Sequence, residues 1–163
     1  MCAAGAVTIW LASGLGGQSL GELEAFLPPE TDVTTTAATP GSSVALHWIV
    51  NDHQLALSQA AAEKRLVFID FTGYTCTNCR WMEANMFARA DVSAEMSKFV
   101  LSRLYTDGDG PVYDAQQKFQ EDRFGTVALP LYAIVDASGK TVRTFSGLTR
   151  NPGEFIAFLQ SGS

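Results

Sequence analysis

The segment FIDFTGYTCTNCRWMEANMF, residues 68–87, contains two of the chain's three cysteines, Cys76 and Cys79, with two residues between them. They follow the apolar run LVFIDF, 66–71, whose β-branched and aromatic residues are typical of a strand buried on both faces. A helix is expected from Cys76 to about Phe87. The pair could be a structural bridge, half of a metal site, or a pair that exchanges electrons.

Predicted helices and strands alternate around this segment. Helices are expected at 51–65, with Asn51 or Asp52 as N-cap, from Asp91, and at 112–125, closed by Gly125. A last helix is expected from Asn151-Pro152, with Phe155, Ile156 and Leu159 facing inward. Strands are expected at 99–107, 131–136 and 141–147, and the turn ASGK joins the last two. Residues Val92, Met96 and Phe99 form one apolar stripe. This order predicts an α/β fold, a sheet with helices on both faces.

The size and charge of the chain limit the possibilities. With 163 residues and 47% hydrophobic content, it has room for one full core. A net charge of −6 argues against a nucleic-acid binder, which would carry a basic stripe. Residues 28–43, PPETDVTTTAATPGSS, have linker composition. We therefore expect an apolar arm at 1–27, a linker at 28–43 and one folded domain at 44–163.

The arm carries no charge from residue 3 to residue 20. A signal peptide needs a cationic start, which this stretch lacks, and the strongly apolar part Ala3–Leu15 is shorter than the roughly 20 residues of a membrane helix. Two interpretations remain open. The arm packs on the domain or is disordered, or it is the end of a membrane helix that begins further upstream. Lack of Lys and Arg there suits the non-cytoplasmic side.

The position of Cys76 favours redox chemistry. At a helix start the free backbone N–H groups and the helix dipole stabilise a thiolate, and cysteines in such Cys-x-x-Cys settings have lowered pKa values. Cys79, one turn further, would resolve a mixed disulfide. Zinc would require a second ligand pair, whereas His47 and His53 have no suitable spacing. A purely structural bridge over so short a loop would give little stabilisation.

The motif also resembles a known family. VFIDFTGYTCTNC is similar to the active-site region of the thioredoxin superfamily, and CRWMEANMF resembles the C-terminal, periplasmic thioredoxin-like domain of the DsbD family and its relatives in cytochrome c biogenesis. The resemblance covers roughly residues 47–160. It implies a thioredoxin-like fold, with a central mixed sheet flanked by helices on both faces, and a thiol–disulfide oxidoreductase activity.

Two acidic residues are candidate catalytic groups. By strand alternation Asp70 shares a face with Phe68, and burial would raise its pKa, so that it could relay a proton to or from Cys79; the resemblance places an acid at this position. Glu83 lies one turn beyond Cys79, where the family carries a glutamate thought to tune the cysteines. The alternatives are an Asp70 turned to solvent and a Glu83 on a solvated face. Arg80 could lower the pKa of a nearby thiol, but the commoner expectation for such an Arg is a surface position.

The resemblance also implies a substrate-binding region. It predicts that Pro130, in VALPLYAIVD, is a cis proline opposite the disulfide, which leaves the backbone before it, at Leu129, free to pair with a substrate strand. The alternative is a trans proline at the start of a strand. Tyr74 takes the place of an aromatic lid near Cys76. Together Leu129, Pro130 and Tyr74 are the predicted substrate-binding residues.

These features predict a periplasmic protein-disulfide reductase domain. It would pass electrons from a membrane-embedded thiol relay domain to disulfide-bearing periplasmic proteins or apocytochrome c, as a monomer tethered to the inner membrane. The Cys76–Cys79 disulfide would serve as its redox centre, with no metal, nucleotide or other cofactor and no nucleic acid partner. Two alternatives remain: a stand-alone oxidase or isomerase of the same fold, and a binding module that holds a metal or partner without turnover.

Overall fold

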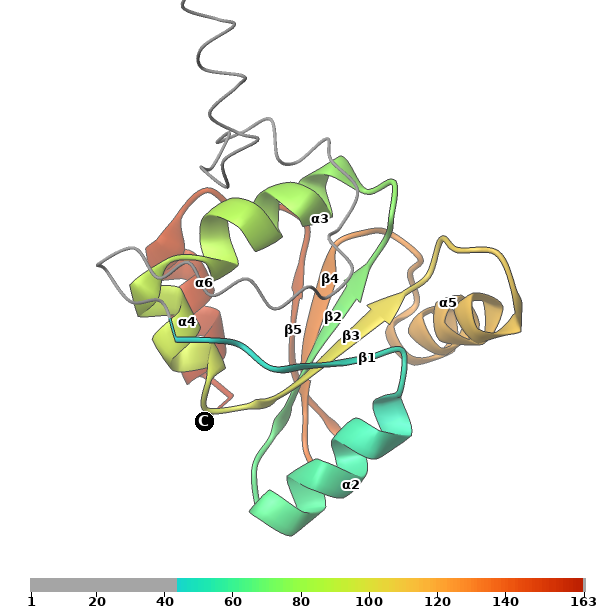
Figure 1. Cartoon of the computed structure of the whole chain (residues 1–163), viewed down its shortest axis with the longest axis horizontal. Helices are drawn as coiled ribbons and strands as arrows, with labels where there is room; N and C mark the ends of the chain where they lie inside the picture. The colour runs from blue at the N-terminus through green and yellow to red at the C-terminus, as the bar shows by residue number, and fades with distance from the viewer. Residues whose placement is uncertain (1–43, 163) are drawn as a thin grey trace, which may run out of the picture.

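The structure is a computed structural model and describes residues 44–162. The predicted arm, 1–27, and linker, 28–43, lie outside the described residues. Within residues 44–162, five strands form one sheet in the order β1-β3-β2-β4-β5 (Figure 1). The strands are β1 (Trp48–Val50), β2 (Val67–Thr72), β3 (Val100–Tyr105), β4 (Leu131–Val135) and β5 (Thr141–Ser146). The first three pair in parallel and the last two join antiparallel, which makes the sheet mixed, as predicted.

Helices cover both faces of this sheet (Figure 1). They are α2 (His53–Glu63), α3 (Thr77–Trp81), its π-helical continuation η2 (Met82–Phe87), α4 (Ala90–Met96), α5 (Pro111–Phe124) and α6 (Pro152–Gln160). Apolar residues of α2 and α5 pack on one face of the sheet. Residues of η2, α4 and α6 pack on the other. The predicted α/β architecture is confirmed.

The central strand β2 is buried along its whole length, as its composition predicted. Alternation separates its side chains, because neighbouring residues of a strand point to opposite faces. Val67, Ile69 and Phe71 pack against α2 and α5. Phe68 contacts the rings of Phe87, Tyr132, Phe155 and others on the opposite face. The alternation therefore places Asp70 with Phe68, on the side that α3 and η2 cover.

Several helix ends also agree with the sequence. Asp52 is the N-cap of α2, where its side chain accepts a hydrogen bond from the Leu55 N–H at 2.9 Å. Gly125 ends α5 with a φ of 70°, and Asn151 caps α6. In the last helix Phe155 and Leu159 are buried as predicted, while Ile156 is only partly buried. Phe158, which the prediction omitted, is buried beside them.

The short strand β1 was not predicted. Its three residues pair in parallel with β3, opposite Leu101 to Arg103, and Trp48 packs against the core on the α3 side. Among residues 44–162, no helix is long and apolar enough to cross a membrane.

Candidate active site

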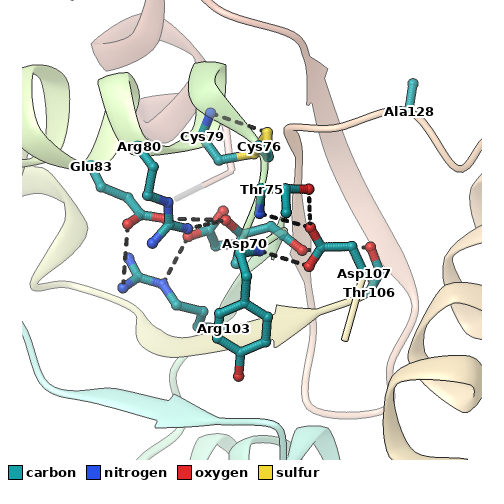
Figure 2. The surroundings of a disulfide bond; sticks show 12 residues. Asp70, Thr75, Cys76, Cys79, Arg80, Glu83, Arg103, Thr106, Asp107 and Ala128 are labelled. Atoms are coloured by element: carbon teal, nitrogen blue, oxygen red, sulfur yellow. Dashed lines mark hydrogen bonds and ion pairs between the residues drawn. A yellow bond between two sulfur atoms is a disulfide. The ribbon is translucent and has the colours of Figure 1, made fainter. Parts of the chain in front are cut away.

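Cys76 and Cys79 form a disulfide where β2 passes into α3 (Figure 2). Their Cα atoms are 5.3 Å apart. Cys76 is the N-cap of α3, and its sulfur accepts a hydrogen bond from the Cys79 N–H at 3.2 Å. Cys76 is partly exposed, whereas Cys79 is fully buried. An incoming partner can therefore reach the first sulfur, and the second is available only from within the protein.

Asp70 is buried beneath this helix and pairs with an arginine. Its side chain is 1% exposed, and Arg103 Nε donates to its Oδ2 at 3.0 Å. The pairing follows from the sheet, because Arg103 on β3 stands directly opposite Asp70 in the parallel register. Burial raises the pKa of Asp70 from 3.8 to about 7; the Arg103 charge opposes this rise and the Glu83 charge adds to it. The predicted burial of Asp70 is confirmed, and its catalytic role stays a prediction.

A second ion pair, Arg80–Glu83, lies close to Asp70. Arg80 Nη2 donates to Glu83 Oε1 at 2.6 Å and to Thr72 Oγ1 at 2.7 Å, and the Thr72 hydroxyl donates to Glu83 Oε1 at 3.1 Å. Glu83 Oε2 also approaches Arg103 Nη1 at 3.9 Å. Two carboxylates and two guanidinium groups are thus held together behind the disulfide (Figure 2). We call Asp70, Arg80, Glu83 and Arg103 the charge cluster.

The expectation that Arg80 lies at the surface was wrong. Its side chain is only 5% exposed, and its guanidinium carbon lies 5.7 Å from the centre of the Tyr105 ring. Burial is tolerated because Glu83 neutralises the charge and Thr72 accepts a further hydrogen bond. Glu83 is correspondingly not on a freely solvated face, since its side chain is 16% exposed and paired.

Tyr74 stands two residues before Cys76 and is held by two other tyrosines. Its ring is 40% exposed and stacks on Tyr105 at a centroid distance of 4.1 Å. Its hydroxyl lies 3.3 Å from that of Tyr113 on α5. The hydrogen bond with Tyr113 and partial burial raise the pKa of Tyr74 to about 12, so the ring is neutral. A partly exposed aromatic ring therefore stands two residues before Cys76, and its role as a lid or substrate-binding residue stays a prediction.

Pro130 follows a cis peptide bond from Leu129, as the resemblance implied, rather than the trans alternative. Leu129 is close to the turn that precedes Cys76, because a Cβ added to Gly73 would lie 3.0 Å from Leu129 Cδ1. The Pro130 carbonyl accepts a hydrogen bond from the Gly147 N–H at 2.8 Å. Their role in substrate binding stays a prediction.

Asp107 is the site residue that sequence analysis missed. Its Oδ1 accepts from the Tyr74 N–H at 2.6 Å, and its Oδ2 accepts from the Thr75 N–H at 2.9 Å and the Thr75 hydroxyl at 2.8 Å (Figure 2). It follows β3 in the sequence, 32 positions from Thr75. The signal that could have found it is an acid just past the end of a parallel neighbour strand, at the same edge of the sheet.

No group of three or more potential metal ligands occurs within the part of the chain that the structure describes. His53, one of the two histidines weighed as ligands, lies against the Phe119 ring on the α2 side of the sheet, with its pKa lowered by burial. It is therefore packed among apolar groups.

Comparisons with known proteins agree with this geometry. The sequence profile described as thioredoxin-like matches residues 48–137. No curated protein matches the chain in sequence. Among solved structures, a DsbH oxidoreductase superposes with a TM-score of 0.61 at 14% identity, covering 81% of this chain and 94% of its own.

Two further structures are similar to the same degree. The reduced C-terminal domain of DsbD from Neisseria meningitidis has a TM-score of 0.59 and 18% identity, covering 71% of this chain and 100% of its own. A thioredoxin from Thermus thermophilus has a TM-score of 0.58 and 23% identity, covering 72% of this chain and 86% of its own. At such identities these likenesses concern the fold. With a profile match over more than half of its length and a disulfide that fits a redox-active site, this chain belongs to the thioredoxin-like family.

Proposed function

We propose that the domain is a protein-disulfide reductase of the periplasm, which passes electrons from a membrane-embedded thiol partner to disulfide-bearing proteins or apocytochrome c. The observation that carries the proposal is the asymmetry of the cysteine pair. Cys76 is accessible and its sulfur already faces the Cys79 N–H at 3.2 Å, whereas Cys79 is buried. Such an arrangement suits one attacking and one resolving thiol.

The reaction begins with the reduced pair. The Cys76 thiolate attacks one sulfur of the partner's disulfide, forming a mixed disulfide and releasing the first partner thiolate. Cys79 then gives up its proton and attacks the Cys76 sulfur. This forms the Cys76–Cys79 disulfide and releases the second partner thiolate. Two electrons have passed to the partner, which takes up two protons, and the domain is oxidised.

The charge cluster provides a place for the proton of Cys79. Asp70 is buried on the face of the sheet that α3 and η2 cover, and its pKa near 7 allows it to accept and release a proton close to neutral pH. The Arg103 charge favours the ionised form of Asp70 and so limits the rise of its pKa. We assign Asp70 the role of proton acceptor in the resolving step, and Glu83 that of a charge that tunes it.

Insulin reduction with dithiothreitol as electron donor tests the activity. The wild type should reduce insulin, and Cys76→Ser should abolish this while leaving the fold intact by circular dichroism. Activity retained in Cys76→Ser would overturn the proposal. In Cys79→Ala the mixed disulfide cannot be resolved, so the reduced variant, mixed with insulin after dithiothreitol has been removed, should accumulate a covalent adduct that added dithiothreitol cleaves.

The direction of electron flow distinguishes a reductase from the oxidase or isomerase alternative. A reductase should have a potential near the roughly −270 mV of thioredoxins, whereas an oxidase of this fold has a potential near −120 mV. Equilibration of the purified protein with glutathione buffers measures this quantity. A strongly oxidising value would replace the reductase proposal by the oxidase.

The likeness of the fold to DsbD C-terminal domains supports the periplasmic and membrane-linked parts of the proposal. They are tested in cells with the Cys79→Ala variant, which should trap its partners as mixed disulfides. Recovery of a membrane protein with a cysteine pair in its spans, together with periplasmic thiol proteins, supports the relay. Recovery of cytoplasmic proteins alone would contradict it.

A further inference from the structure

The two residues before Cys76, Tyr74 and Thr75, are held by a residue that follows another strand, β3. The backbone N–H groups of Tyr74 and Thr75 and the Thr75 hydroxyl all donate to the carboxylate of Asp107, at 2.6, 2.9 and 2.8 Å. The Cys76 N–H donates to the Gly73 carbonyl at 3.3 Å, which closes the turn. We call this set of hydrogen bonds to Asp107 the clamp. Both carboxylate oxygens of Asp107 thus accept hydrogen bonds from the turn that precedes Cys76.

The space around the clamp is closely fitted. A Cβ added to Gly73 would lie 2.6 Å from Asp107 Oδ2, closer than non-bonded atoms approach. The ring of Tyr74 is fixed by stacking on Tyr105 and by the hydroxyl contact with Tyr113. The turn is therefore held through its backbone by Asp107 and through its one large side chain by two tyrosines.

From these contacts we infer that Asp107 is a positioning residue for Cys76. It fixes the turn in the conformation in which the Cys76 sulfur lies over the start of α3 and accepts from the Cys79 N–H. The inference rests on the proposed function, because positioning matters only if Cys76 is the attacking thiol. Asp107 acts through the backbone of the turn, whose Tyr74 and Thr75 N–H groups it binds.

The charge of Asp107 works against its positioning role. Partial burial disfavours its ionised form, but the hydrogen bonds from Thr75 and Tyr74 outweigh this and lower the pKa of Asp107. The carboxylate is therefore ionised at neutral pH, and its negative charge would by itself disfavour a Cys76 thiolate. The other titratable groups near the turn are Tyr74, Tyr105 and Tyr113, and behind the disulfide lies the charge cluster, of which Arg80 faces Tyr105. Loss of the Asp107 charge would therefore lower the Cys76 pKa, whereas loss of the clamp would raise it.

This opposition gives a decisive experiment. The full chain carries Cys2→Ser and Cys79→Ser, so that Cys76 is the single thiol, and its pKa is measured from the pH dependence of iodoacetamide alkylation. Asp107→Asn removes the charge and one acceptor oxygen. Asp109→Asn, two residues further and exposed, removes the same charge without touching the clamp. Gly73→Ala forces Asp107 aside without changing any charge.

If the clamp positions Cys76, Gly73→Ala raises the Cys76 pKa by about half a unit or more, which slows alkylation roughly three-fold at pH values well below that pKa. Asp107→Asn raises it by less, because the lost charge acts in the other direction. Asp109→Asn leaves the pKa unchanged or lowers it. Gly73→Ala decides, because it changes no charge: a Cys76 pKa that falls or stays unchanged in this variant overturns the inference. Should it not fold, an Asp107→Asn pKa no higher than that of Asp109→Asn overturns the inference. The proposed function fails separately, if the wild type does not reduce insulin.

Discussion

Replacing Asp70 by asparagine should change how the stability of the oxidised protein depends on pH. Burial raises the pKa of Asp70 to about 7 in the folded protein, whereas an aspartate in the unfolded chain ionises near 3.9. Between these two values the folded protein holds a proton that the unfolded chain has lost. The free energy of unfolding therefore falls as the pH rises from about 4 to about 7.

The magnitude follows from the size of the shift. From 3.8 to about 7 is roughly three pKa units, and one unit corresponds to about 1.36 kcal/mol. The full loss is thus at most about 4 kcal/mol, of which about 2 to 3 kcal/mol falls between pH 5 and pH 8. The Asp70→Asn variant cannot ionise and lacks this loss. Its stability relative to the wild type should rise by that amount over the same interval.

Urea unfolding followed by tryptophan fluorescence, at pH 5, 6, 7 and 8, measures this difference. The protein is kept oxidised, so that Cys76 and Cys79 do not titrate. Burial lowers the pKa of His53, but this effect is common to both proteins and cancels in the difference. In the control Asp122→Asn, which removes an exposed carboxylate paired with Lys118, the free energy of unfolding should depend on pH as it does in the wild type. A difference between Asp70→Asn and wild type that stays constant from pH 5 to pH 8 would refute the reasoning.

Other substitutions probe the surroundings of the site. Arg103→Met should raise the pKa of Asp70 above about 7, because the Arg103 guanidinium stabilises the ionised carboxylate. Carbon-13 NMR of the Asp70 carboxyl group measures this pKa, and a value lower than in the wild type would contradict the ion pair. Phe68→Ala should lower the free energy of unfolding by about 3–5 kcal/mol, since this ring is fully buried; a urea midpoint like that of the wild type would refute its place in the core. Tyr74→Ala should raise the KM for insulin severalfold while shifting the reduction potential little, and an unchanged KM would remove Tyr74 from the docking surface beside Cys76.

The central part of the fold could be predicted because its causes are local. The run 66–71 is apolar at nearly every position, which suits only a strand covered on both faces. Helix ends such as Asp52, Gly125 and Asn151 carry their own capping chemistry. By contrast β1 has three residues, too few for a pattern, and it is a strand only because β3 offers a parallel partner.

The polar part of the site depends on long-range register, which the sequence does not display. Alternation placed Asp70 on the face of Phe68, but the pairing with Arg103 requires knowing that β3 lies next to β2 in one particular register. Arg80 appeared to be a surface residue because its partner on the sheet, Thr72, meets it only after the helix packs on β2, although Glu83 lies three residues further along the same helix. Asp107 likewise meets Thr75, 32 positions away in the sequence, only because β3 lies next to β2.

The most direct test of the redox assignment is the pKa of the Cys76 thiol in the reduced protein, with Cys2 and Cys79 replaced by serine. Thiolate absorbance at about 240 nm, followed from pH 4 to pH 10, gives this value. A sulfur held at the start of α3, facing the Cys79 N–H, should ionise well below the roughly 8.5 of a free cysteine. A pKa at or above that of a free cysteine would contradict its assignment as the attacking thiol.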